Sequence, residues 1–184
     1  MSVIEHFEEL RSRIINAVLS VLVATCVCFF YAEQVLRLLK APAGASFQLN
    51  AFGPMDGFIV RWKVALWAGI VLTSPNWLYQ LIAFVRPGLT FAERRMLWPA
   101  LTGATVLFVL GTAFGYVLLG GMLHVLFGMF GTELNYLPNA SQYISFVVFF
   151  MLACGISFEL PVVLPGLVKL GLLKQQSLKR QRKI

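Results

Sequence analysis

Four long and almost uncharged stretches set the strongest limit on how this 184-residue chain can fold. An apolar run of about 20 residues is long enough to cross the hydrocarbon core of a bilayer as a helix. Composition agrees, because 59% of the residues are hydrophobic and only 12% are charged, unlike ordinary soluble domains. The sequence therefore predicts an all-α integral membrane protein, a single transmembrane domain over residues 1–184, with four transmembrane helices near residues 14–32, 63–85, 97–120 and 141–166.

Lysine and arginine are distributed unequally between the loops on the two sides of the membrane. The side that holds both termini carries eleven basic residues: Arg11, Arg13, Arg86, Arg94, Arg95, Lys169, Lys174, Lys179, Arg180, Arg182 and Lys183. The other side carries four: Arg37, Lys40, Arg61 and Lys63. Because basic loops stay in the cytoplasm, we expect a multi-pass protein of the cytoplasmic (inner) membrane with both termini cytoplasmic. Attraction to the lipid bilayer explains the net charge of +7, so no nucleic-acid partner is expected.

Glu159 carries the only acidic or basic side chain between residues 134 and 168, inside the fourth predicted span. A charged group at the centre of a bilayer costs roughly 2.5 to 3.5 kcal/mol on insertion scales, so such residues face the protein interior or a water-filled cavity. An ionisable residue inside a span is therefore treated first as a candidate functional residue. The structural alternative is a carboxyl group that hydrogen-bonds to Ser157 or to a polar group on another helix.

The N-terminal residues predict an amphipathic helix that runs directly into the first span. Apolar side chains recur at helical spacing from Val3 to Ile14, and Ser2 and Glu5 have the spacing of a capping box. Two pairs of opposite charges also have helical spacing: Glu9 with Arg13, and Glu8 with Arg11. Local ion pairs of this kind are one complete explanation for these acidic residues.

Prolines and glycines predict the shape of the spans. Pro75 removes a backbone donor inside the second span and is expected to kink it. The pair Gly120–Gly121 is expected to bend the third stretch, and the spacing of Gly111 and Gly115 favours close helix packing within one chain. We interpret the cysteines as apolar packing residues and expect neither a disulfide nor a metal site from them: Cys26, Cys28 and Cys154.

Three motifs follow one another at characteristic separations. The first is His6–Ile14, with the sequence HFEELRSRI, and the second is Pro87–Leu89 followed by Glu93–Arg95 in the first inner loop. The third is Gly155–Pro161, with the sequence GISFELP. Together with Tyr79–Gln80 in the second span, they resemble the TatC family of twin-arginine translocase proteins over essentially the whole chain. This resemblance implies a curved, glove-like helix bundle.

The resemblance also implies a receptor and scaffold, not an enzyme, that works without a cofactor. Its partners would be TatA- and TatB-type single-span subunits, a second copy of the chain in a homo-oligomer, and folded precursor proteins with twin-arginine signal peptides. Glu159 and Gln80 match intramembrane polar positions that contact partners. The matching signal-peptide-binding positions lie at the N-terminus and in the first inner loop: Glu9, Leu10, Arg11, Phe84, Pro87, Leu89, Glu93, Arg94 and Arg95.

Members of this family have six spans, and the resemblance places the start of the fifth close to the end of this sequence, near residues 179–184. We therefore expect the fifth and sixth helices to be missing. Two other functions stay open at this point: a small proton-coupled transporter that uses Glu159, and a structural, non-receptor membrane subunit that binds no ligand.

Overall fold

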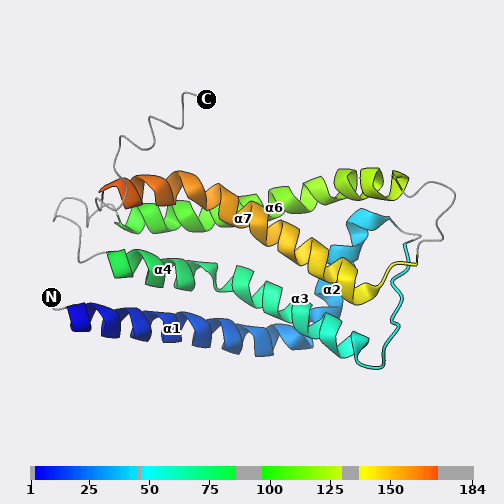
Figure 1. Cartoon of the computed structure of the whole chain (residues 1–184), viewed down its shortest axis with the longest axis horizontal. Coiled ribbons are helices and arrows are strands. Elements are labelled where there is room, and N and C mark those ends of the chain that lie inside the picture. The colour runs from blue at the N-terminus through cyan, green and yellow to red at the C-terminus, as the bar shows by residue number, and fades with distance from the viewer. Residues whose placement is uncertain (1–2, 45–46, 86–96, 130–136, 170–184) are drawn as a thin grey trace.

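The computed structural model describes residues 3–44, 47–85, 97–129 and 137–169, with side chains over 7–44, 47–84, 98–129 and 137–162. Over these residues the secondary structure is helical, apart from one isolated parallel bridge between Asn50 and Asn139. The helices (Figure 1) are α1 (Val3–Phe30), α2 (Ala32–Lys40), the short 3-10 helix η1 (Ala41–Ala43), α3 (Asp56–Leu72), α4 (Ser74–Val85), α6 (Leu97–Gly128) and α7 (Ala140–Lys169).

Three segments are each long and apolar enough to cross a membrane: Phe7–Phe30, Trp98–Gly128 and Ala140–Val162. Helices α3 and α4 meet at a bend of 56° and pass the same test together, as one broken span. The prediction of an all-α membrane protein is therefore confirmed, and the described residues contain four spans when α3 and α4 are counted as one.

The bend between α3 and α4 lies where Pro75 predicts it. Pro75 is the second residue of α4, and its missing N–H interrupts the helical hydrogen bonds at this point. Side chains satisfy backbone carbonyls on the α3 side of the break. Trp77 Nε1 donates to Ile70 O at 3.0 Å, and Thr73 Oγ1 donates to Gly69 O at 2.7 Å.

One helix bound agrees with the prediction and another differs from it. Helix α1 begins at Val3, so the expected N-terminal helix continues into the first span without a break, as predicted. Helix α6 runs through Gly120–Gly121 to Gly128, so the bend predicted at this glycine pair is wrong. The neighbours Leu119 and Leu123 are buried, and this packing outweighs the roughly 1 kcal/mol that a glycine costs in a helix.

Helix α2 lies in a segment where no helix is expected from the sequence. It is amphipathic: Ala32 and Leu39 are buried, whereas Glu33 and Arg37 are exposed and pair with each other at 2.8 Å. The topology argument counts Arg37 and Lys40 only as charges in a loop, but both residues lie in the last turn of this helix. Their spacing relative to Glu33 and to the apolar side chains is the signal that indicates a helix.

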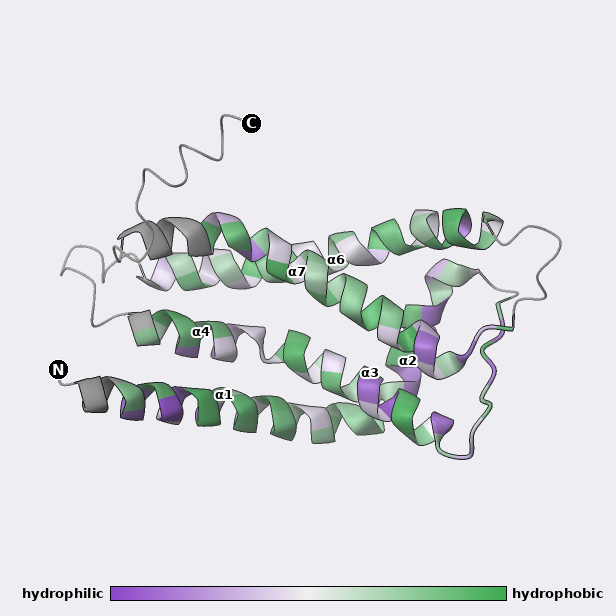
Figure 2. Ribbon diagram, in the orientation of Figure 1, coloured by the Kyte–Doolittle hydropathy of each residue, from purple (hydrophilic) through white to green (hydrophobic). Residues whose placement is uncertain are grey.

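The helices form an open row (Figure 1). Helices α3 and α4 lie in the middle, α1 packs along one side of them, and the pair of α6 and α7 packs along the other. The start of α1, the end of α4, the start of α6 and the end of α7 lie together, and we call this the N-terminal end. The opposite end, which contains α2, is called the α2 end. Hydrophilic residues gather toward these two ends, and the helices between them are mostly hydrophobic (Figure 2).

Two clusters of buried side chains hold the row together. The larger one lies toward the α2 end and joins α2, α3, α6 and α7 through residues such as Leu39, Val64, Leu119 and Ile144. The smaller one lies between the α3–α4 bend and the N-terminal end. It is centred on three residues from α4 and α6: Leu78, Ala104 and Phe108. The candidate site residues lie around this smaller cluster and at the N-terminal end.

Candidate functional site

Helices α6 and α7 approach each other so closely that glycine is required at their contact. A Cβ atom on Gly111 would lie 2.8 Å from the Cβ of Phe158, and one on Gly155 would lie 2.8 Å from Thr112 Oγ1. These distances are shorter than Cβ contacts in real structures, so a larger residue forces the helices apart. Gly115 is similarly crowded. The predicted packing role of the Gly111 and Gly115 pair within one chain is confirmed.

Glu159 lies one helical turn beyond Gly155 and therefore on the face of α7 that approaches α6. It is only 5% exposed, and neither carboxyl oxygen has a hydrogen-bond partner among the described residues. The Ser157 hydroxyl donates instead to Ala153 O at 2.7 Å, so the expected alternative of a Glu159–Ser157 hydrogen bond is absent from this part of the chain. Pro161, which lacks an N–H, also leaves the Ser157 carbonyl without its usual helical donor.

A buried carboxyl group without a partner is rare and calls for an explanation, because desolvation of a polar group costs free energy unless a hydrogen bond replaces water. The residues around Glu159 in α7 border the smaller cluster: Gly155, one turn before it, lies against Phe108, and Val162, three residues after it, packs on the cluster. Such a group is suited to accept or donate a hydrogen bond to a molecule that enters from outside the chain.

Gln80, the second expected intramembrane contact, lies on α4 and is half-buried. No hydrogen bond joins it to Glu159 over the residues that the structure describes. Both helices contribute to the smaller cluster: Leu78 of α4 is one of its buried residues, and Val162 of α7 packs against it. The structure therefore places both polar groups in the same half of the molecule without pairing them.

Glu9 lies on the second turn of α1, at the N-terminal end. Its Oε1 atom accepts two hydrogen bonds from Arg13, one of them from Nε at 3.0 Å, and each side chain is 23% exposed. The other carboxylate atom, Oε2, is buried and has no hydrogen-bond partner in the described part of the chain. The predicted local pair of Glu9 and Arg13 is thus present, but it satisfies only one of the two oxygens.

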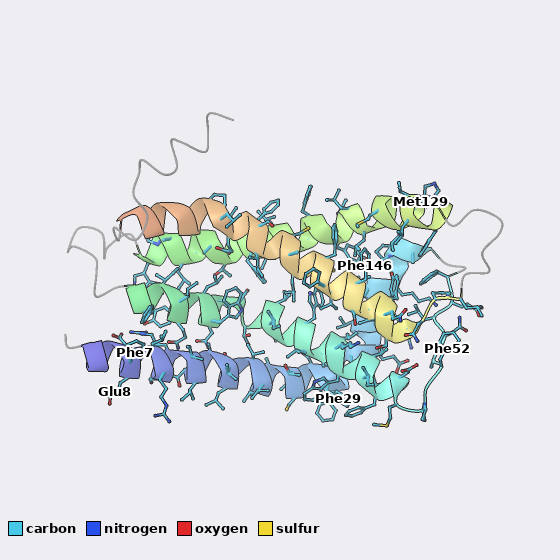
Figure 3. The ribbon with its side chains drawn as sticks, viewed as in Figure 1. Phe7, Glu8, Phe29, Phe52, Met129 and Phe146 are labelled. Carbon is cyan, nitrogen blue, oxygen red and sulfur yellow. The ribbon has the colours of Figure 1, made fainter. Side chains whose placement is uncertain are left out.

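The residues next to Glu9 in the sequence differ in how far they are exposed. Glu8 and Arg11 are exposed, and the ion pair expected between them is not found among the described residues. Figure 3 shows Glu8 pointing away from α4. Leu10 is half-buried, and Phe84, at the end of α4, is also half-buried.

Helices α1 and α4 pack against each other, so Glu9 lies at the end of the row from which the chain continues into residues 86–96. The remaining expected signal-peptide contacts fall in that segment and lie outside the described residues: Pro87, Leu89, Glu93, Arg94 and Arg95.

The α2 end contains contacts that sequence reasoning missed. Two tyrosine hydroxyls from different spans donate to consecutive carbonyls at the end of α2: Tyr116 to Leu38 O at 3.0 Å, and Tyr143 to Leu39 O at 3.1 Å. These contacts join residues 78 and 104 positions apart, and no local pattern indicates them.

Lys63 forms the other missed contact at the α2 end. Its Nζ donates to the hydroxyls of Ser141 and Ser145, at 2.8 and 2.7 Å, and to Ser141 O at 3.3 Å. With these three bonds, each proton of the ammonium group has an acceptor. Lys63 therefore fastens α3 to the first turns of α7, and this basic residue has a structural role besides its effect on topology.

The described residues contain no group of three or more histidine, cysteine, aspartate or glutamate side chains that could hold a metal ion. The cysteines of this part of the chain are free: Cys26, Cys28 and Cys154. Two carboxyl groups in this helix row therefore have unpaired oxygens, both oxygens of Glu159 and one of Glu9, and such groups are suited to binding cationic or hydrogen-bonding partners.

Comparison with known proteins gives one consistent result. The family model described as "Sec-independent protein translocase protein (TatC)" matches residues 5–184. The chain is 35% identical to the Sec-independent protein translocase protein TatC of a Synechocystis strain, over 97% of this chain and 70% of that protein. It is also 35% identical to the TatC protein of Aquifex aeolicus, over 100% of this chain and 79% of the relative.

A chloroplast relative is matched over a smaller share of its own length. The chain is 36% identical to the chloroplastic TATC protein of Oryza sativa subsp. japonica, over 97% of this chain and 50% of that protein. Among solved structures, one described as "Twin Arginine Translocase Receptor- TatC in DDM" superimposes with a TM-score of 0.85. That structure is 35% identical in sequence, and the match covers 97% of this chain and 82% of that one.

Proposed function

This chain belongs to the TatC family, a component of the Sec-independent protein translocase, and we propose that it is the component that recognises twin-arginine signal peptides. In this function it acts as a receptor and scaffold for the export of folded proteins. It works by binding and catalyses no covalent reaction, so it needs no cofactor. The description of the similar crystal structure as a translocase receptor supports this assignment.

The observation that carries the proposal is the half-satisfied carboxylate of Glu9 at the N-terminal end. A guanidinium group is a rigid fork that a carboxylate accepts with two parallel hydrogen bonds, and two arginines need two acceptors. We propose Glu93 as the second acceptor. Leu10, Arg11 and Phe84 would shape the surface around the peptide, together with the contacts expected in the loop that follows α4.

Peptide binding tests this function. The purified chain in detergent should bind a peptide with paired arginines more tightly than the same peptide with paired lysines. Glu9→Ala and Glu93→Ala should each weaken arginine-peptide binding by about 1.5 to 3 kcal/mol, the worth of a hydrogen bond to a charged group. Glu8→Ala is the matched control, because this exposed neighbour points away from α4. Equal affinity of the parent for both peptides would reject the receptor function.

We further propose that Glu159 is the docking point for the transmembrane helix of a TatA- or TatB-type partner. The support is its burial without a partner, since a polar group on an incoming helix would supply the missing hydrogen bond. Gln80 would offer a second polar contact in the same half of the row. Glu159→Gln keeps a donor and an acceptor and should retain crosslinking to the partner, whereas Glu159→Ala should lose it.

The proton-coupled transporter predicts the opposite ranking at Glu159. A carboxyl group that must release a proton cannot be replaced by an amide, so Glu159→Gln would abolish activity as completely as Glu159→Ala. No second buried carboxyl group is present among the described residues to form a relay. The docking function is therefore the better supported of the two.

We propose that the protein lies in the cytoplasmic membrane with its N-terminal end toward the cytoplasm. The basic residues near this end support the orientation, because they favour the inner side. A cysteine placed at Thr90, in the segment between α4 and α6, should react with an impermeant reagent only from the cytoplasmic side. A cysteine at Phe52, exposed at the α2 end, should react only from the outside (Figure 3). Labelling of Thr90 from outside would reverse the assignment.

A further inference from the structure

Arg13 already occupies the carboxylate that we propose as a signal-peptide acceptor. Its Nε and Nη2 atoms both donate to Oε1 of Glu9, so one guanidinium group of the chain itself forms the kind of contact that an incoming arginine would form. The pair is on a single helix, four residues apart, and each side chain is 23% exposed. The contact is therefore accessible enough to exchange.

The remaining oxygen of Glu9 offers no open alternative. Oε2 is buried and has no hydrogen-bond partner within the described residues, so a guanidinium group from outside cannot reach it while the side chain holds this conformation. One oxygen of the carboxylate is engaged and the other is covered. An arginine that approaches from outside must therefore release Glu9 from Arg13 before it can bind with two hydrogen bonds.

We propose that Arg13 is a built-in competitor of the signal peptide, which closes the Glu9 acceptor until an arginine of the peptide displaces it. This inference rests on the proposed receptor function. In thermodynamic terms, the peptide binds only the fraction of molecules in which Glu9 is free, and the apparent dissociation constant rises by the inverse of that fraction. A peptide with a weaker cation gains less from the carboxylate and displaces Arg13 less readily, so the exchange also sharpens selection for arginine.

The same chain supplies a matched control pair. Glu33 and Arg37 on α2 have the same spacing of four residues and join at 2.8 Å, but they lie at the α2 end, away from the proposed site. Their side chains are 58% and 77% exposed. Removing Arg37 breaks an equivalent ion pair and removes the same charge without changing Glu9, so it separates local exchange from a general effect of net charge.

The test compares peptide affinities of full-length variants in detergent, measured with a twin-arginine peptide and its twin-lysine counterpart. Because a partly exposed helix pair is weak, Arg13→Gln should bind the arginine peptide about two- to six-fold more tightly than the parent. Arg13→Lys, which keeps a charge but lacks the fork, should fall between the two. Arg37→Gln should match the parent. Unchanged thermal unfolding of each variant shows that the fold is retained.

The outcomes separate this inference from the function on which it rests. If the parent prefers arginine and Glu9→Gln weakens binding, but Arg13→Gln binds equally or less tightly, then Arg13 is not a competitor and the receptor function stands. If Arg37→Gln tightens binding as much as Arg13→Gln, the effect is one of net charge and the competitor role is rejected. A parent chain without any arginine preference contradicts both the function and the inference.

Discussion

The two ends of this helix row treat their polar groups in opposite ways. At the α2 end, Tyr116 and Tyr143 hold the last carbonyls of α2, and Lys63 has an acceptor for each of its protons. Toward the N-terminal end, Glu159 keeps two buried oxygens without partners, and Glu9 keeps one, over the residues described. The same packed helices extend to both ends of the row, so the two ends do not differ in the kind of fold that surrounds their polar groups.

The contrast separates contacts that build the protein from groups that await a ligand. Buried polar groups in folded proteins are nearly always hydrogen-bonded, because an unpaired one costs about 1 to 3 kcal/mol. Two neutral polar atoms, Trp67 Nε1 and Ser74 Oγ, are also buried without a partner among the described residues, so the contrast between the two ends concerns the charged groups. The unpaired carboxyl groups are therefore best explained as acceptors for partners, and the paired groups as structural. The predictions below are ways to test that division.

The largest expected effect concerns the contact that places Glu159. Gly155→Leu would force a side chain against Thr112 and Phe108, so it should lower the free energy of unfolding by at least about 1 to 3 kcal/mol. Thermal unfolding in detergent measures this change. Gly121→Leu is the control, because a Cβ atom there meets nothing within 4 Å. If both variants unfold alike, the close approach of α6 and α7 does not determine the position of Glu159.

A smaller effect is expected at the α2 end. Tyr143→Phe removes a buried hydrogen bond and leaves Leu39 O unpaired, so it should lower the free energy of unfolding by about 1 kcal/mol. Tyr116→Phe should cost less, because water can replace its more exposed hydroxyl. Neither variant should change peptide affinity. A loss of peptide binding in Tyr143→Phe would show that the α2 end is not purely structural.

The smallest effect is a dependence on pH at α2. The hydrogen bond from Arg37 and its positive charge hold the pKa of Glu33 below its ordinary value. A lowered pKa means that Glu33 contributes stability above its unfolded pKa and loses it as the pH falls through the folded one. The small difference in melting temperature between the parent and Glu33→Gln should therefore be present at about pH 7 and become smaller as the pH falls to about 3. A difference that persists undiminished at the lower pH contradicts this explanation.

The spans and the bend follow from the sequence because lipid imposes simple rules. Uncharged length predicts a crossing helix, and Pro75 predicts a break because it cannot donate a backbone hydrogen bond. Gly120–Gly121 misleads for a physical reason: the buried leucines on either side stabilise the helix more than the glycines weaken it. Local rules are reliable here only where no distant contact overrides them.

Some features of the candidate site can likewise be predicted from the sequence, and others cannot. A lone carboxylate in an apolar span predicts the burial of Glu159, and helical spacing predicts the pair of Glu9 and Arg13. The close approach at Gly155 and the tyrosine contacts to α2 could not be predicted, because each depends on residues far apart in the chain. The role of Glu93 in binding stays a prediction.

One comparison of peptide affinities tests the central division most directly. Glu9→Gln and Glu33→Gln each remove one negative charge and each break an ion pair of the same spacing, one at the N-terminal end and one at the α2 end. Loss of a charge-assisted contact should weaken twin-arginine peptide binding by about 10- to 150-fold in Glu9→Gln, whereas Glu33→Gln should bind like the parent. Equal affinities in both variants would contradict the account, because the half-satisfied carboxylate would then be no more important for recognition than the more exposed one on α2.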